Sequence, residues 1–366
     1  MNLFSQHKTA SPNVDRKASG VAAIFGLRPS HAVQAEPATV RLSLLGREHA
    51  GKTALLNLVS QGTDGLASGL QVDVEGPWDM AKRIQDTRQT VELLRRTGLP
   101  STLDRPKLEV HLYEGDVKWI TLSFHEVVGQ LLSSTTRESS PEQKEQCGAY
   151  LSEVRLSDVA WVVLPSPPRE ATYDDLSRYD NDIKLTRAYL RESLRLRSGH
   201  PCSVAIVLTK LDTLFTGAEE AKAQLEKGHL IEVLRPLCDL LQASEKVNRA
   251  AIFPTTSFGW NNAIPRQVKQ DANGKSDGIP HDGRQAGGLE QGETEWILRP
   301  GVSPQPYNLT ALLVWTFVSG ILFQHFCDDH HTEGGLGRIC SSLNGDLKAL
   351  ENAWYVHLKG EELSME

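Results

Sequence analysis

The sequence predicts an α/β fold in which a mostly parallel β-sheet is covered by helices on both faces. Two observations carry this prediction. Short apolar runs of strand length alternate along the chain with longer runs of helical periodicity, and a glycine-containing turn joins the first apolar run to the first helix. About one third of the way along the chain, two segments of alternating polarity predict a β-hairpin, which adds one antiparallel edge strand.

The first predicted elements are a strand at residues 40–45 and a helix that contains residues 54–58. The residues between them, GREHAGKT at 46–53, match the phosphate-binding pattern G-x-x-x-x-G-K-T. In a strand–loop–helix frame, the backbone N–H groups of such a loop surround a phosphate, and the helix N-terminus adds positive potential. The alternative is a glycine-rich turn that binds no ligand.

If the loop binds a nucleotide, Lys52 is expected to reach the β- and γ-phosphates, where it contributes to catalysis, and the hydroxyl of Thr53 is expected to bind Mg²⁺. The loop residues expected to contact the nucleotide are Gly46, Arg47, Glu48, His49, Ala50, Gly51, Lys52, Thr53 and Ala54.

The remaining predicted elements follow in chain order. A helix is expected at about 80–94, where apolar residues recur at helical spacing. The hairpin consists of residues 107–114 and 118–126, with a short glycine-containing turn between them. Further strands are expected at 158–166, 202–210 and 250–257, and further helices at about 173–198, 219–245 and 309–325.

The last of these helices lies in a segment, 307–326, that contains no Asp, Glu, Lys or Arg and has about the length of a membrane span. Its scattered Asn, Thr, Ser, Gln and His residues and the lack of basic flanks favour a buried helix over a membrane anchor. No membrane contact is therefore expected.

The charge and the cysteine content of the chain limit its expected partners and cellular location. The net charge is −7, and the basic residues are dispersed along the chain, so nucleic acid is not expected as a partner. The five cysteines are odd in number and form no C-x-x-C pair, which indicates a reducing compartment and a cytoplasmic location.

A second motif follows the strand at 202–210. The sequence Thr209-Lys210-Leu211-Asp212 resembles the N/T-K-x-D motif with which GTPases read guanine. The carboxylate of Asp212 can accept hydrogen bonds from the ring N–H and the exocyclic amine of guanine, a donor pair that adenine lacks. The stem of Lys210 would lie over the base, and Ser257 is placed like the residue whose backbone N–H contacts the guanine carbonyl.

Together with the hairpin, these motifs resemble Ras-like (TRAFAC-class) P-loop GTPase domains, and most closely the G domains of the bacterial double-GTPase type. That resemblance places Glu126-Val127-Val128-Gly129 where the family has D-x-x-G. Glu126 would hold Mg²⁺ through a water, and Gly129 would contact the γ-phosphate. Gln130 would orient the attacking water. Thr102, with Thr97 as the weaker choice, would bind Mg²⁺ from the first switch.

The resemblance implies a protein that binds GTP with Mg²⁺ and hydrolyses it slowly as a switch, together with a protein partner or by self-association. The bacterial group is associated with conflict or defence operons. Two alternatives remain: a GTP-binding assembly scaffold that does not hydrolyse GTP, and an ATP-dependent P-loop kinase whose T-K-x-D is accidental.

The expected domain organisation follows from the same elements. A flexible tail is expected at 1–38, a G domain at 39–325 with a polar insertion at about 261–306, and a helical appendage at 326–366.

Overall fold

The computed structural model describes part of the chain. The described residues are 37–47, 50–59, 66, 68–75, 107–126, 155–166, 173–226, 229–267, 294–299, 301–327, 335–350 and 354–360. All of them belong to one compact unit, Pro37–Glu366.

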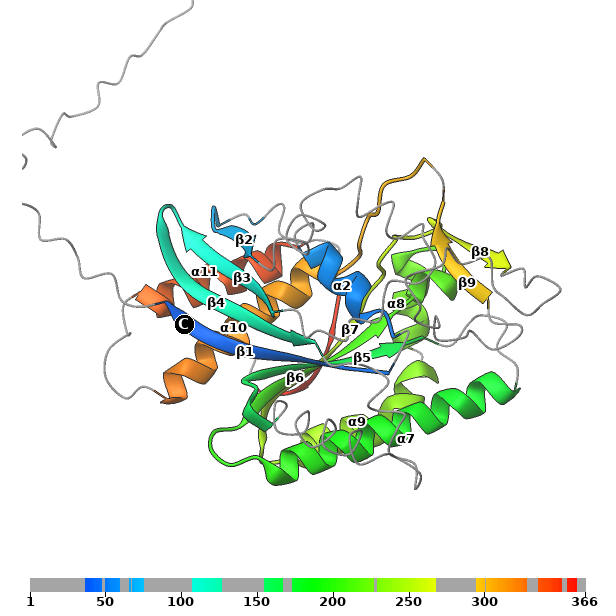
Figure 1. The fold of residues 1–366 in the computed structure, drawn as a ribbon, viewed down its shortest axis with the longest axis horizontal. Coiled ribbons are helices and arrows are strands. Elements are labelled where there is room, and N and C mark those ends of the chain that lie inside the picture. Colours follow the sequence, from blue (N-terminus) through cyan, green and yellow to red (C-terminus); the bar gives the residue numbers. More distant parts are fainter. Residues whose placement is uncertain are drawn as a thin grey trace, which may run out of the picture. The chain divides into compact units, whose positions relative to one another are not determined.

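An eight-stranded sheet forms the centre of this unit, with the strand order β10-β7-β6-β5-β1-β4-β3-β2 (Figure 1). The strands are β1 (Ala38–Leu45), β2 (Gln71–Glu75), β3 (Lys107–Glu114), β4 (Val117–Glu126), β5 (Val159–Pro165), β6 (Cys202–Thr209), β7 (Val247–Pro254) and β10 (Val356–Lys359). β4, β1, β5, β6 and β7 run parallel to one another, whereas β3 is antiparallel to β4. The structure thus confirms the predicted α/β fold with a mostly parallel sheet.

Two strands of this sheet were not expected from the sequence. β2 pairs antiparallel with β3, so it lies outside the predicted hairpin and forms that edge of the sheet. β10 pairs antiparallel with β7 and forms the opposite edge. The hairpin itself forms as predicted, with Val110 of β3 opposite Leu122 of β4.

The helices are α2 (Lys52–Leu58), α7 (Tyr173–Leu196), α8 (Ala218–Glu226), α9 (His229–Ala243), α10 (Leu309–Cys327) and α11 (Gly335–Ala349), and a short 3₁₀ helix, η2, spans Leu211–Thr213. The region predicted as one helix at 219–245 forms two, α8 and α9. The helix predicted at 80–94 lies outside the described residues.

Both faces of the sheet are covered, as predicted. Figure 1 shows α7 and α9 on one side of the sheet, and α2, α10 and α11 on the other. The central strands alternate between the two cores: Trp161 and Val163 of β5 pack with the α10 side, while Val162 and Leu164 pack with the α7 side. Because both of its faces are buried, β5 is apolar without interruption.

α10 is the uncharged segment that has about the length of a membrane span. It lies between the sheet and α11, and side chains all around it are buried, which accounts for its uniformly apolar sequence. Its Thr316 hydroxyl accepts a hydrogen bond from Trp161 Nε1 at 3.0 Å and donates one to the Leu312 carbonyl at 2.7 Å. A Cβ at Gly320 would lie 2.7 Å from Val40 of β1, so the helix approaches the sheet closely there. Among the described helices, none is both long and apolar enough to cross a membrane.

The stretch expected as a polar insertion contains a separate antiparallel pair, β8 (Ala263–Gln267) and β9 (Thr294–Leu298). The stretch expected as a helical appendage contains α11 and β10, both of which contribute to the domain: Leu343 of α11 is fully buried in the core, and β10 extends the sheet. Asn308, just before α10, links the end of β7 to the segment that leads into β10, because its Nδ2 donates to the Pro254 carbonyl at 3.1 Å and to the Trp354 carbonyl at 2.5 Å.

Candidate functional site

The G-x-x-x-x-G-K-T loop lies at the carboxyl end of β1, between the ends of β4 and β5. Ligands of open parallel sheets bind at this edge. Both glycines of the motif are needed for the loop to fit. A Cβ at Gly46 would lie 2.6 Å from the Val163 carbonyl oxygen of β5, and Gly51 adopts φ = 90°, a left-handed conformation that other residues rarely take.

The side chain of Lys52 folds back over this loop. Its Nζ donates hydrogen bonds to the carbonyl oxygens of Gly46 and Arg47, each at 2.9 Å, and the residue is only 6% exposed. The start of the loop therefore holds the ammonium group in place beside the N-terminus of α2. A fixed positive charge beside a helix N-terminus favours an anionic ligand such as a phosphate.

Thr209 connects the loop to the second motif. Its Oγ1 donates to the Ala50 carbonyl at 2.6 Å and contacts the Leu164 carbonyl at 3.3 Å. A Cβ at Gly51 would lie 3.3 Å from the same Oγ1, so the loop and the end of β6 are tightly packed. The structure thus brings together two motifs that are far apart in the sequence.

We expect Thr209→Val to weaken nucleotide binding about threefold to tenfold and to lower the free energy of unfolding by about 1–2 kcal/mol, because the buried Ala50 carbonyl loses its donor. Urea unfolding and a titration with fluorescent GDP measure the two effects. Ser193→Ala is the matched control, since it also removes one buried hydroxyl, which donates to the Tyr189 carbonyl within α7 at 2.9 Å. That control should lose stability without losing affinity. If Thr209→Val bound GDP as tightly as the wild type, Thr209 would not hold the loop in its binding conformation.

Lys210 begins the turn that positions the rest of this motif. It has φ = 60° and ψ = 26°, a left-handed conformation that is uncommon for a residue other than glycine. Its carbonyl accepts hydrogen bonds from the backbone N–H of Thr213 at 3.0 Å and from the Thr213 hydroxyl at 2.7 Å. The 3₁₀ turn that results places Asp212 directly after the end of β6.

Asp212 is the most unusual group at this edge of the sheet. Burial raises the pKa of its carboxyl to about 6, against the lowering effect of backbone hydrogen bonds, including one from Phe258, and of the Lys210 charge. Its Oδ2 is buried and has no hydrogen-bond partner within the described part of the chain. A buried carboxylate oxygen without a donor is costly, so this atom is suited to a ligand that brings its own N–H groups.

Ser257 follows β7 and precedes Phe258, the residue whose backbone contacts Asp212. The backbone N–H and the hydroxyl of Thr255 both donate to the Leu208 carbonyl, at 2.7 and 2.8 Å, which fixes this loop against the end of β6. The structure therefore brings Ser257 to the same edge of the sheet as the 46–53 loop and Asp212.

The other predicted site residues are only partly described. Thr53 lies in the first turn of α2, and Glu126 ends β4 opposite Leu44 of β1; the structure describes their backbone positions but not their side chains. The predicted residues that lie outside the described part of the chain are Glu48, His49, Thr97, Thr102, Gly129 and Gln130.

One contact of the loop was missed by the sequence analysis. Arg47 forms an ion pair with Asp182 of α7, so this side chain is directed away from the loop and toward the helix. α7 carries several acidic residues, and nothing in their spacing distinguishes Asp182. Only the packing of α7 beside the loop selects it.

No protein-family model matches the sequence, and no match is found among the curated proteins. Solved structures do give matches. A substituted variant of SsGBP is 14% identical over 61% of this chain and 51% of its own, with a TM-score of 0.31. A GTP-binding protein from the hyperthermophilic archaeon Sulfolobus solfataricus, in complex with GDP, is 14% identical over 60% of this chain and 47% of its own, with a TM-score of 0.29.

The translation elongation factor SelB from Methanococcus maripaludis, in complex with the GTP analogue GPPNHP, is 11% identical over 61% of this chain, with a TM-score of 0.30. The match spans 31% of SelB, so this chain covers about half or less of the length of each of these three proteins. Similarity at this level carries no inference about function, which has to come from the site itself.

Proposed function

We propose that this protein binds guanine nucleotides, with the phosphates in the 46–53 loop and the base against Asp212. The observation that carries the proposal is the buried Oδ2 of Asp212, which has no donor among the described residues and lies at the same sheet edge as the loop. Guanine supplies two neighbouring N–H donors to such a carboxylate, whereas adenine does not. That the similar solved structures are GTP-binding proteins agrees with the proposal but does not carry it.

A titration of the full chain with labelled GTP, GDP and ATP tests this function. We expect GTP and GDP to bind, and ATP to bind about 30–150-fold more weakly, because adenine leaves the Asp212 carboxylate without its donors, a loss of about 2–3 kcal/mol. Comparable affinity for ATP would favour the kinase alternative. Phosphate release measured in the same samples separates a hydrolysing switch from a scaffold.

The proposal includes Mg²⁺, held by the hydroxyls of Thr53 and Thr102 and, through a water, by Glu126. The backbone positions of Thr53, directly after Lys52, and of Glu126, one strand away from β1, are compatible with this set. When bound, the ion would neutralise charge on the nucleotide phosphates. Glu is one methylene longer than the Asp common in this position, but it keeps the charge and the oxygen ligands that Mg²⁺ prefers.

We further propose that hydrolysis is slow, with Gln130 orienting water and Gly129 contacting the γ-phosphate, at roughly the 10⁻⁴–10⁻² s⁻¹ of unassisted G domains. Glu48, two residues after the first glycine of the loop, would narrow the approach of a partner's arginine. Stimulation by self-association or by a dedicated partner fits this arrangement better. The role in a bacterial conflict or defence system rests on the double-GTPase resemblance alone.

Nucleotide affinity should depend on the ionisation of Asp212. Because its pKa is raised to about 6, the carboxylate is almost fully ionised at pH 7.5 and about one-tenth ionised at pH 5. Only the ionised form accepts both guanine donors, so GDP affinity should fall about tenfold over this range. The GDP affinity of Asp212→Asn over the same pH range gives the effect of phosphate titration alone, which is then subtracted from the wild-type profile. The idea is wrong if the two profiles have the same shape.

A further inference from the structure

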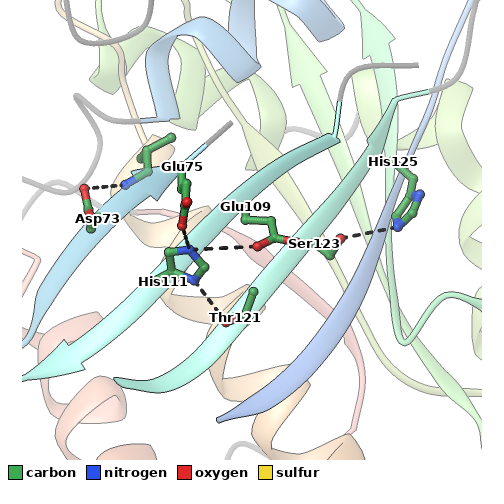
Figure 2. A network of polar contacts seen from close by, with 8 residues as sticks. Asp73, Glu75, Glu109, His111, Thr121, Ser123 and His125 are labelled. Atoms are coloured by element: carbon green, nitrogen blue, oxygen red, sulfur yellow. Dashed lines mark hydrogen bonds and ion pairs between the residues drawn. The ribbon is translucent and has the colours of Figure 1, made fainter. Parts of the chain in front are cut away.

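A group of metal-binding side chains lies on the outer part of the sheet, apart from the nucleotide site. Along β3, Leu108, Val110 and Leu112 face the core, so Glu109 and His111 between them face the opposite side. β2 brings Glu75 to the same face, since Glu75 pairs with Glu109. Figure 2 shows Glu75, Glu109 and His111 directed toward one another from these two neighbouring strands.

The polar ends of the three side chains lie close together. His111 Nε2 lies 3.0 Å from Glu75 Oε2 and 4.0 Å from Glu109 Oε2, and the three candidate ligand atoms all lie within 4.8 Å of one another. The imidazole is only 2% exposed, whereas Glu75 is 71% exposed, so the group has a buried base and an open side. An ion could enter from that side without disturbing the core.

The other nitrogen of His111 is held by Thr121 of β4, whose Oγ1 lies 3.0 Å from Nδ1 (Figure 2). Nε2 is at hydrogen-bond distance from Glu75, so a bound cation would take the place of the proton between these two atoms. With the Nδ1–H donated to the Thr121 hydroxyl oxygen, Nε2 then offers its lone pair to the ion. An imidazole that coordinates through one nitrogen and donates from the other is the usual arrangement of a histidine metal ligand.

We propose that Glu75, Glu109 and His111 form a binding site for a divalent transition metal, and that this metal is Zn²⁺. One imidazole and two carboxylates are ligands that Zn²⁺ accepts, and a water completes a tetrahedral set. The two carboxylates balance the charge of the ion. Mg²⁺ does not compete, because it prefers oxygen ligands and retains its waters.

The site is separate from the proposed nucleotide site. Glu109, the ligand nearest the loop along the strands, pairs with Ser123 of β4, and Ser123 pairs with Arg41 of β1, five residues before Gly46. Five residues of strand span roughly 16 Å. Metal binding and nucleotide binding can therefore be tested independently.

The ligands also determine what the metal would do for the fold. Glu75 belongs to the edge strand β2, while Glu109 and His111 belong to β3, so the ion would fasten the edge strand to the sheet. Binding to the folded state alone raises stability according to the ratio of metal concentration to Kd. A rise in Tm with Zn²⁺ is thus a second readout, independent of any activity.

The test uses the full chain, freed of metal with a chelator, and titrated with Zn²⁺ by calorimetry without nucleotide. We expect one tight site in the wild type and a higher Tm on binding. Glu75→Gln, at an exposed position that should not affect folding, should weaken binding at least tenfold, and His111→Gln should abolish it. Thr121→Val, which only positions the imidazole, should weaken binding about 10–100-fold.

Two controls define the site. His357→Ala, a histidine on the opposite edge strand β10, should bind Zn²⁺ like the wild type, and so should Lys52→Ala, which separates this result from the nucleotide proposal. With Co²⁺ as a probe, the absence of a sulfur-to-cobalt charge-transfer band would exclude the cysteines. The proposal is overturned if the metal-free wild type binds no Zn²⁺, or if Glu75→Gln and His111→Gln both bind it unchanged.

Discussion

Replacing Lys52 with alanine should raise the Kd for GTP and GDP by about 100-fold or more while the domain stays folded. The ammonium group is fixed over the loop by the carbonyls of Gly46 and Arg47, so it would face bound phosphates without reorganisation. A charge-assisted contact of this kind contributes about 1.5–3 kcal/mol, and Lys52 would make it to two phosphates. Within the described part of the loop, the second cationic side chain, Arg47, is paired with Asp182 and offers no replacement.

Fluorescent GDP titration, with circular dichroism and thermal unfolding of the same samples, measures this effect. Lys184→Ala is the matched control, because Lys184 is an exposed cation on α7 that pairs with Asp180 at 2.5 Å, a surface contact of little energetic weight. The control should bind like the wild type. Unchanged affinity in Lys52→Ala, with the fold intact, would show that the loop does not bind phosphate.

Asp212→Asn should change the preferred base from guanine to xanthine. The asparagine amide can donate to the additional carbonyl oxygen of xanthine, but it accepts only one of the two guanine donors and carries no charge. We expect GTP affinity to fall by about 30–100-fold, which corresponds to about 2–3 kcal/mol for a buried charge-assisted pair. Affinity for XTP should rise above that for GTP.

Asp212→Ala separates the loss of GTP affinity from the change in base preference. It removes the carboxylate without providing a new donor, so it should weaken GTP binding without favouring XTP. Competition between labelled GDP and each triphosphate gives the ratios directly. If Asp212→Asn weakened the binding of all nucleotides equally, Asp212 would stabilise the loop rather than recognise the base.

The central strands could be predicted from the sequence because a strand buried on both faces has to be apolar at every position. β6 shows this, with Val204, Ile206 and Leu208 in one core and Ala205 and Val207 in the other. The short edge strands give no such pattern. β10 is half-buried at each of its residues, so its sequence does not differ from that of a loop.

In the candidate site, too, some features could be predicted from the sequence and others could not. Glycine spacing and the T-K-x-D pattern predict the loop and Asp212 as site residues, because their conformations depend on the local backbone geometry. The hydrogen bond from Thr209 to Ala50 and the pair of Arg47 with Asp182 depend on tertiary packing, which no local pattern encodes. The same holds for His111, whose surroundings are set by the register of three strands.

The pairing of β10 with β7 has a consequence for biosynthesis. On the ribosome, β7 is complete at Pro254, but the strand that covers its outer edge is not made until Val356–Lys359, after α10 and α11. Until then the nascent chain exposes an unpaired parallel-sheet edge, a template for pairing with strands of other chains. A ribosome that pauses between these two points would hold a chain prone to aggregation, so this interval is where we expect the protein to depend most on chaperones.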